Sequence, residues 1–108
     1  MTQQGRVYNK GVLAGIIEKD PSGYTFSYDT SYLLNPDLSA ISLTLPKSKI
    51  PYHSATLFAF FFGLLAEGSL KDIQCRDLKI DENDHFTRLL KTCSTNVIGS
   101  VTVQEASK

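Results

Sequence analysis

Residues 57–68, LFAFFFGLLAEG, place four phenylalanines and three leucines within nine positions that carry no charge. On a helical wheel most of these side chains form one apolar stripe, made up of Leu57, Phe58, Phe61, Leu64 and Leu65. Phe60 and Phe62 lie at opposite edges of the stripe and widen the apolar arc to roughly 200°, about twice what one packed helix face needs. The predicted helix therefore carries more apolar surface than a single contact can bury.

Two interpretations of this apolar helix remain open. In the first, the helix lies between a sheet and neighbouring helices, and all seven large side chains belong to the core. In the second, part of the arc stays uncovered until another protein packs on it, and exposed phenylalanine rings anchor that partner. A membrane-spanning helix is excluded, because the uncharged run at residues 50–66 contains Pro51 and only about ten strongly apolar positions, half of what a bilayer requires.

The composition is that of a small soluble domain. The chain has 108 residues, and its 11 Lys and Arg balance its 11 Asp and Glu, so no basic surface is predicted that would attract nucleic acid or anionic lipid. We expect one domain over residues 1–108. The N-terminus lacks the apolar segment of a secretory signal, which predicts a cytoplasmic protein. Cys75 and Cys93 match neither a disulfide framework nor a paired metal site, and we expect free thiols.

The N-terminal part of the chain has the pattern of β-strands. Two β-rich runs flank Asn9, Lys10 and Gly11, where glycine can adopt a positive φ, and this predicts a hairpin. A turn at residues 20–23, DPSG, leads into YTFSYD at 24–29, whose alternation predicts a strand with its aromatic side chains on one face.

Further elements are predicted before and after the apolar stretch. A short helical turn should end before Pro36, and a strand is predicted at residues 40–46, AISLTLP, with Ile41, Leu43 and Leu45 on one face. Residues 54–66 predict a helix because they contain no proline and no charge.

The C-terminal part predicts two more helices and a strand. One helix should open at Ser69, and another at Asp81 or Asp84 with Phe86, Leu89 and Leu90 on one side. The tail, residues 96–103, predicts a strand with Gly99 at a bulge or close approach. The fold class is therefore α+β: an antiparallel sheet with two or three helices packed on it and the C-terminal strand returning to the sheet.

No catalytic or metal-binding constellation is visible in the sequence. His53 and His85 are isolated from other ligand residues, so each is expected at a surface or interface. The acidic run at residues 81–85, DENDH, lacks the glycine and the terminal acidic residue of a calcium loop, and helix capping explains it better. We therefore expect no enzyme activity, no metal and no cofactor.

Five segments in this chain stand in an order that is specific when they are taken together. They are VYNKGVLAG (7–15), YTFSYD (24–29), ISLTLP (41–46), FFFGLLAEG (60–68) and DHFTRLLKTCSTNVIGSVTV (84–103). They span nearly the whole sequence, which resembles the N-terminal subdomain of the HipA family of serine/threonine kinase toxins. The sequence departs from that family at Ala66, where the family commonly has proline.

This resemblance implies a function in a toxin–antitoxin system. The kinase core that carries the family's ATP-binding and catalytic residues is expected to be absent. In three-component HipBST systems, a small protein of this kind acts as antitoxin to a shortened kinase toxin, HipT, while a helix-turn-helix protein, HipB, handles operator DNA. The resemblance thus implies an antitoxin that neutralises a HipA-like kinase by docking next to its active-site cleft. The alternative is a structural module that bridges the kinase and the helix-turn-helix protein in a repressor complex.

The apolar helix supplies the candidate contact residues for such a partner. We expect Phe62, at the edge of the stripe, to be the main anchor, with Phe58 from the same helix and with Tyr52 and His53 from the preceding loop. Glu67 and Arg76 are candidate rim contacts, where exposed charges contribute less than about 1 kcal/mol each. No direct contact with nucleic acid or membrane is expected.

Overall fold

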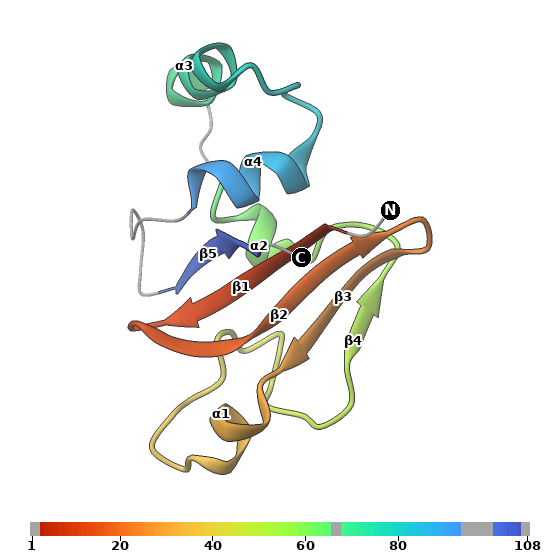
Figure 1. The fold of residues 1–108 in the computed structure, drawn as a ribbon, viewed down its shortest axis with the longest axis vertical. Helices are drawn as coiled ribbons and strands as arrows, with labels where there is room; N and C mark the ends of the chain where they lie inside the picture. Colours follow the sequence, from red (N-terminus) through yellow and green to blue (C-terminus); the bar gives the residue numbers. More distant parts are fainter. Residues whose placement is uncertain (1–2, 66–67, 94–100, 107–108) are drawn as a thin grey trace.

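The computed structural model describes residues 3–65, 68–93 and 101–106, and within them it contains one antiparallel sheet (Figure 1). The strands are β1 (Gln3–Asn9), β2 (Val12–Asp20), β3 (Gly23–Tyr28), β4 (Tyr52–Ser54) and β5 (Val101–Glu105). Their order across the sheet is β4-β3-β2-β1-β5. The C-terminal strand therefore returns to the sheet, as the sequence predicts, where it lies beside β1, and the α+β fold class is confirmed. Residues 96–100 of the predicted strand, including Gly99, lie outside the described residues.

The first hairpin has the geometry that its sequence predicts. Lys10 and Gly11 connect β1 to β2 with φ angles of 53° and 82°, and two successive positive φ values are typical of the type I′ turn that matches strand twist. The second turn is stabilised by Asp20, whose carboxylate accepts hydrogen bonds from the Ser22 backbone N–H at 2.8 Å and the Ser22 hydroxyl at 2.5 Å. These bonds lower the pKa of Asp20, the side-chain bond most strongly.

Four helices accompany the sheet in the described residues: α1 (Thr30–Leu34), α2 (Ala59–Phe62), α3 (Gly68–Leu78) and α4 (His85–Thr92). Helix α4 is capped by Asp84, whose carboxylate accepts hydrogen bonds from the Thr87 N–H and hydroxyl. It buries Phe86, Leu89 and Leu90, in agreement with the sequence prediction. Helix α3 contains no buried residue and lies at one end of the molecule, with α1 at the other (Figure 1).

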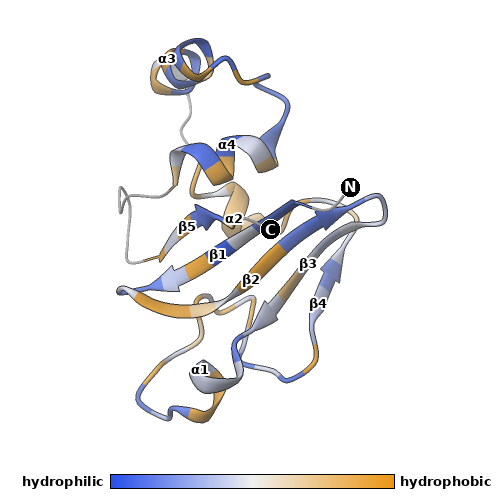
Figure 2. Cartoon of the chain, viewed as in Figure 1, coloured by the Kyte–Doolittle hydropathy of each residue, from blue (hydrophilic) through white to orange (hydrophobic). Residues whose placement is uncertain are grey.

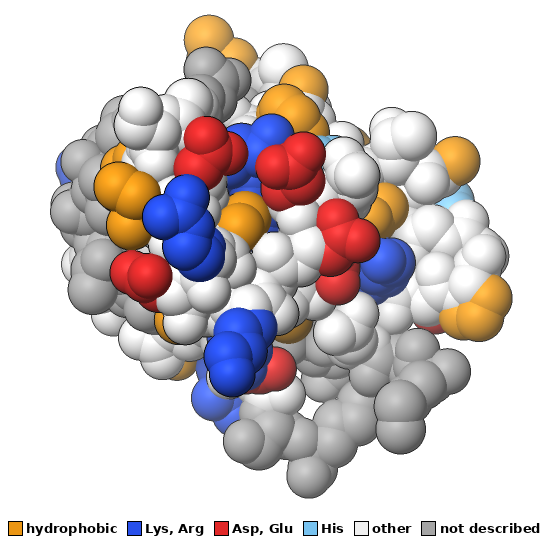
Figure 3. Space-filling view, turned by 90° about the horizontal axis from the view of Figure 1, so that it is seen from above, with side chains coloured by type: hydrophobic (Ala, Val, Ile, Leu, Met, Phe, Trp, Pro, Cys, Tyr) orange, Lys and Arg blue, Asp and Glu red, His pale blue; other side chains and the backbone are white. Residues whose placement is uncertain are grey.

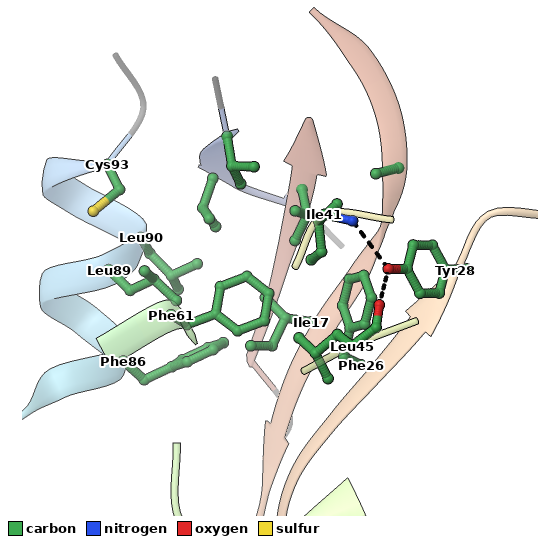
Figure 4. Packing of buried hydrophobic residues seen from close by; sticks show 14 of the residues in the cluster. Ile17, Phe26, Tyr28, Ile41, Leu45, Phe61, Phe86, Leu89, Leu90 and Cys93 are labelled. Carbon is green, nitrogen blue, oxygen red and sulfur yellow. Dashed lines mark hydrogen bonds between the residues drawn. The ribbon is translucent and has the colours of Figure 1, made fainter. Parts of the chain in front are cut away.

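The core forms where α2 and α4 cover one face of the sheet (Figure 4). The side chains with no exposed surface come from both layers and are Val7, Ala14, Ile17, Phe26, Phe61, Phe86, Leu89 and Val103. Helix α4 approaches β1 at a glycine: a Cβ atom on Gly5 would lie 2.6 Å from Leu90 Cδ2. Close packing of α4 on the sheet therefore depends on the missing side chain at position 5.

The helix predicted at residues 54–66 is wrong in extent. Residues Tyr52–Ser54 form strand β4, which pairs with β3, and the helix spans only Ala59–Phe62. Tyr52 and His53, which were predicted to lie in a loop, therefore belong to the sheet edge. Three residues are too few for their sequence pattern to predict a strand. Residues 52–54 form one because the free edge of β3 lies beside them, and strand formation of this kind depends on tertiary context.

The strand predicted at residues 40–46 is also wrong. This segment makes a tight turn in which the Leu45 N–H donates to the Ser42 carbonyl at 3.1 Å. Ile41 and Leu45 are buried, whereas Leu43 is 99% exposed at the tip. The turn is favoured because the buried Tyr28 hydroxyl accepts the N–H of Ile41 at 3.1 Å and donates to the Leu45 carbonyl (Figure 4).

Candidate protein-interaction surface

Helix α2 places neighbouring phenylalanines in opposite environments. Phe61 is completely buried, and its ring centroid lies 5.6 Å from that of Phe26 in the sheet. Phe62 is 45% exposed, because consecutive helical positions point about 100° apart. Figure 2 shows α2 as an apolar segment, in contrast to the mixed α3. The expectation that part of the apolar arc stays uncovered is therefore confirmed at Phe62.

The other phenylalanines of the stretch pack around Phe61 and are half-buried. The ring centroids of Phe58 and Phe60 lie 6.2 Å and 5.2 Å from the Phe61 centroid, both in edge-on arrangements. Phe58 precedes the first helical residue, and its carbonyl accepts a hydrogen bond from the Phe62 N–H at 3.0 Å. Each of the two original interpretations thus holds for part of the stretch: Phe61 is core, and Phe62 is surface.

The ring of Phe62 rests against a histidine from another helix. The Phe62 and His85 ring centroids are 4.9 Å apart with an interplanar angle of 74°, an edge-to-face contact. His85 is the first residue of α4, and its Nδ1 lies 3.4 Å from Arg88 Nη1. The sequence offered no signal for this pair, because two distant positions meet only through the packing of α2 on α4.

The two candidate residues on β4 point to opposite faces of the sheet. Tyr52 pairs with Phe26 on the core face, and its hydroxyl donates to the Pro46 carbonyl at 2.7 Å. His53 pairs with Thr25 on the other face, where its Nδ1 lies 3.1 Å from the Thr25 hydroxyl. Since α2 covers the core face, the structure does not bring His53 to the same side of the sheet as Phe62.

Of the two predicted rim residues, Arg76 lies within the described residues, at the α3 end of the molecule (Figure 1). Arg76 is exposed in the last turn of α3, and Glu67 lies outside the described residues. On the same helix Leu70 and Ile73 are each 50% exposed. Seen from this end, acidic and basic side chains alternate around scattered apolar ones (Figure 3). The surface is therefore mixed in charge rather than strongly acidic or basic.

The described residues offer no grouping suited to metal binding. Among residues 3–65, 68–93 and 101–106, no cluster of three or more His, Cys, Asp or Glu side chains could hold a metal ion.

Both cysteines are free, as expected. Cys93 is buried, and burial raises the pKa of its thiol, which disfavours the reactive thiolate. No helix in the described part of the chain is long and apolar enough to cross a membrane.

Comparisons with known proteins identify the family. The family model of the HipA N-terminal domain matches residues 5–104. An uncharacterised protein of Haemophilus influenzae is 37% identical over 107 residues, which cover 97% of this chain and 94% of that protein. A solved structure described as the N-terminal domain of HipA toxin is similar with a TM-score of 0.69 and 34% identity, covering 98% of this chain and 94% of that one. The chain belongs to the HipA N-terminal domain family.

Proposed function

We propose that this protein is an antitoxin that binds a HipA-like serine/threonine kinase toxin and neutralises it by docking next to the active-site cleft. Its role is then that of HipS, the small protein of HipBST systems, acting in the cytoplasm without catalysis of its own. Family membership supports a toxin–antitoxin context, because the match is to the N-terminal domain of HipA. The observation that carries the proposal is the half-exposed Phe62 ring beside the buried Phe61.

Phe62 has the properties of an interface anchor. A phenylalanine ring buries roughly 150 to 250 Å² when it is fully covered, and aromatic residues dominate the binding energy of many interfaces. Its backbone is held by the α2 hydrogen bond to Phe58 and by the packing of Phe61 on the sheet. The ring is therefore presented from a rigid element, and binding costs less conformational entropy than it would from a loose loop.

The mixed charge of the protein surface fits a protein partner better than a polyanion. The formal net charge is zero, and exposed side chains of both signs surround the apolar residues at the α3 end (Figure 3). Interfaces commonly combine an apolar centre with a polar rim, and in this arrangement Arg76 and Glu67 would contribute at the rim. Rim charges contribute mainly to the rate and specificity of association.

The proposal is tested by titrating a HipA-type kinase that lacks its own N-terminal domain with this protein. Phe62→Ala should weaken the affinity about 30-fold or more, because truncating an anchor costs on the order of 2 to 4 kcal/mol. Val12→Ala is the matched control, because Val12 is 42% exposed at the start of β2 and is not one of the candidate contact residues. Unchanged affinity of a folded Phe62→Ala variant would exclude Phe62 as the anchor.

A second candidate function is a module that bridges the kinase and a helix-turn-helix protein. This function is favoured by a second set of exposed apolar residues around α1 and the following loop, where Leu34, Leu43 and Ile50 are 73%, 99% and 76% exposed. A kinase assay that contains only toxin, ATP and this protein separates the two functions. Inhibition in that mixture supports the antitoxin, whereas full kinase activity in a formed complex supports the bridge.

A further inference from the structure

The contact between Phe62 and His85 joins the exposed ring to a rigid part of the fold. Phe62 ends the short helix α2, and His85 begins α4, whose Phe86 and Leu89 are completely buried in the core. An edge-to-face pair at 4.9 Å between centroids is within the range that stabilises aromatic contacts. His85 therefore supports one side of a ring whose other side remains open to a partner.

The orientation of the His85 ring is itself determined by neighbouring groups. Arg88, one turn further along α4, is only 3% exposed, and its Nη1 lies 3.4 Å from His85 Nδ1 and 3.5 Å from the Glu82 carbonyl. A guanidinium group has donors and no acceptor, so this contact requires Nδ1 of His85 to accept the hydrogen bond. The neutral imidazole then carries its proton on Nε2, and the ring cannot turn without losing the contact with Arg88.

We propose that His85 is a positioning residue that holds the Phe62 ring in the orientation in which it enters the partner. This inference rests on the proposed function, in which Phe62 is the anchor. The chain of contacts runs from the buried Arg88 to the His85 ring and from there to Phe62. Because Phe62 in the free protein then already has the rotamer that it adopts in the complex, little side-chain entropy is lost on binding. Binding thus depends on a residue that does not itself need to touch the partner.

The first experiment reads the ring directly in the free protein and needs no partner. Phe62 ring protons and ring dynamics are followed by NMR in the wild type, in His85→Ala and in His85→Phe, with Asn83→Ala as control. Asn83 is exposed in the loop before α4. We expect increased rotamer averaging of Phe62 in His85→Ala, wild-type behaviour in Asn83→Ala, and recovery of a single rotamer in His85→Phe, which restores an edge-to-face partner. Unchanged Phe62 dynamics in His85→Ala would overturn the proposal.

The second experiment measures affinity for a HipA-type kinase without its own N-terminal domain, in a double-mutant cycle. We expect His85→Ala to weaken binding about 3- to 10-fold, His85→Phe to restore it, and His85→Ala to have no further effect once Phe62 is alanine. Equal losses in the Phe62→Ala and wild-type backgrounds would show a direct contact of His85 with the kinase and would overturn the positioning role.

The two proposals fail in distinguishable ways. If Phe62→Ala weakens binding and His85→Ala does not, the antitoxin site stands and the role of His85 is disproved. If Phe62→Ala leaves the affinity unchanged, Phe62 is not the anchor. The proposal that His85 positions Phe62 for the partner then fails too, even if the NMR data show that His85 restrains the ring. Thermal unfolding of each variant confirms that the measured differences arise in folded protein.

Discussion

Gly15 of β2 lies so close to Ser27 of β3 that a Cβ atom at position 15 would be 2.2 Å from the Ser27 carbonyl oxygen. The glycine follows a β-bulge, since Val7 of β1 opposes Gly15 while the next residue, Tyr8, opposes Leu13. Such a bulge increases the local twist of the sheet, and β2 and β3 approach each other closely at this glycine. The same site holds the ring of Phe26, which would lie 3.1 Å from the added carbon.

Gly15→Ala should therefore destabilise the protein by about 1 to 3 kcal/mol, because a backbone carbonyl cannot yield to the added methyl group as a side chain could. The measurement is urea-induced unfolding followed by circular dichroism. Gly63→Ala is the control, since Gly63 has helical φ and ψ angles, and its added carbon would come no closer than 3.4 Å to another atom. Similar stabilities of the two variants would contradict the close approach seen at Gly15.

Tyr28→Phe should destabilise the turn at residues 41–45. The substitution removes a buried hydroxyl that bonds to both Ile41 and Leu45, and leaves two buried backbone groups without their partner. We expect a loss of about 1 to 3 kcal/mol and faster hydrogen exchange of the Ile41 amide. Tyr52→Phe, which removes an exposed hydrogen bond to Pro46, should cost less than about 1 kcal/mol. Protection of the Ile41 amide that survives Tyr28→Phe would show that other contacts hold the turn.

Asp84→Ala should weaken the start of α4 and, through it, the position of His85. The Asp84 carboxylate accepts the Thr87 N–H at 3.2 Å and the Thr87 hydroxyl at 2.7 Å. Loss of such a cap costs about 1 kcal/mol, and Asp84→Asn should retain most of it because asparagine is an equally good capping residue. The free energies of unfolding of the two variants give the comparison. If both lose the same amount, charge rather than capping is responsible.

The stability of the protein should fall in alkaline solution. Burial raises the pKa of both Cys93 and Tyr28, so the folded chain holds these protons more tightly than the unfolded chain does. As the pH rises above about 8.5, the unfolded thiol ionises first, the unfolded phenol follows near pH 10, and the free energy of unfolding decreases. Below that range both groups are protonated in both states, and they contribute no pH dependence. Thermal unfolding of the wild type and Cys93→Ala between pH 7 and 10.5 checks this, with a shallower initial decline expected for the variant.

Local sequence patterns correctly predict the elements that are stabilised by residues close together in the chain. The hairpin at Lys10 and Gly11 needs a turn with positive φ, and α4 needs a capping aspartate followed by apolar residues at helical spacing. Both are short-range requirements. The apolar stretch at 57–68 likewise predicts surplus hydrophobic surface, and Phe62 is exposed.

Only the tertiary structure decided where segments of ambiguous pattern went. Residues 41–45 alternate like a strand but turn instead, because the Tyr28 hydroxyl satisfies their backbone groups, and residues 52–54 become a strand because β3 leaves an edge open to them. Tertiary packing also brings Phe62 against His85, and strand pairing places His53 on the other face of the sheet from Phe62. These features depend on contacts between distant positions, and the energies of such contacts exceed the small differences in local propensity that a sequence pattern reports.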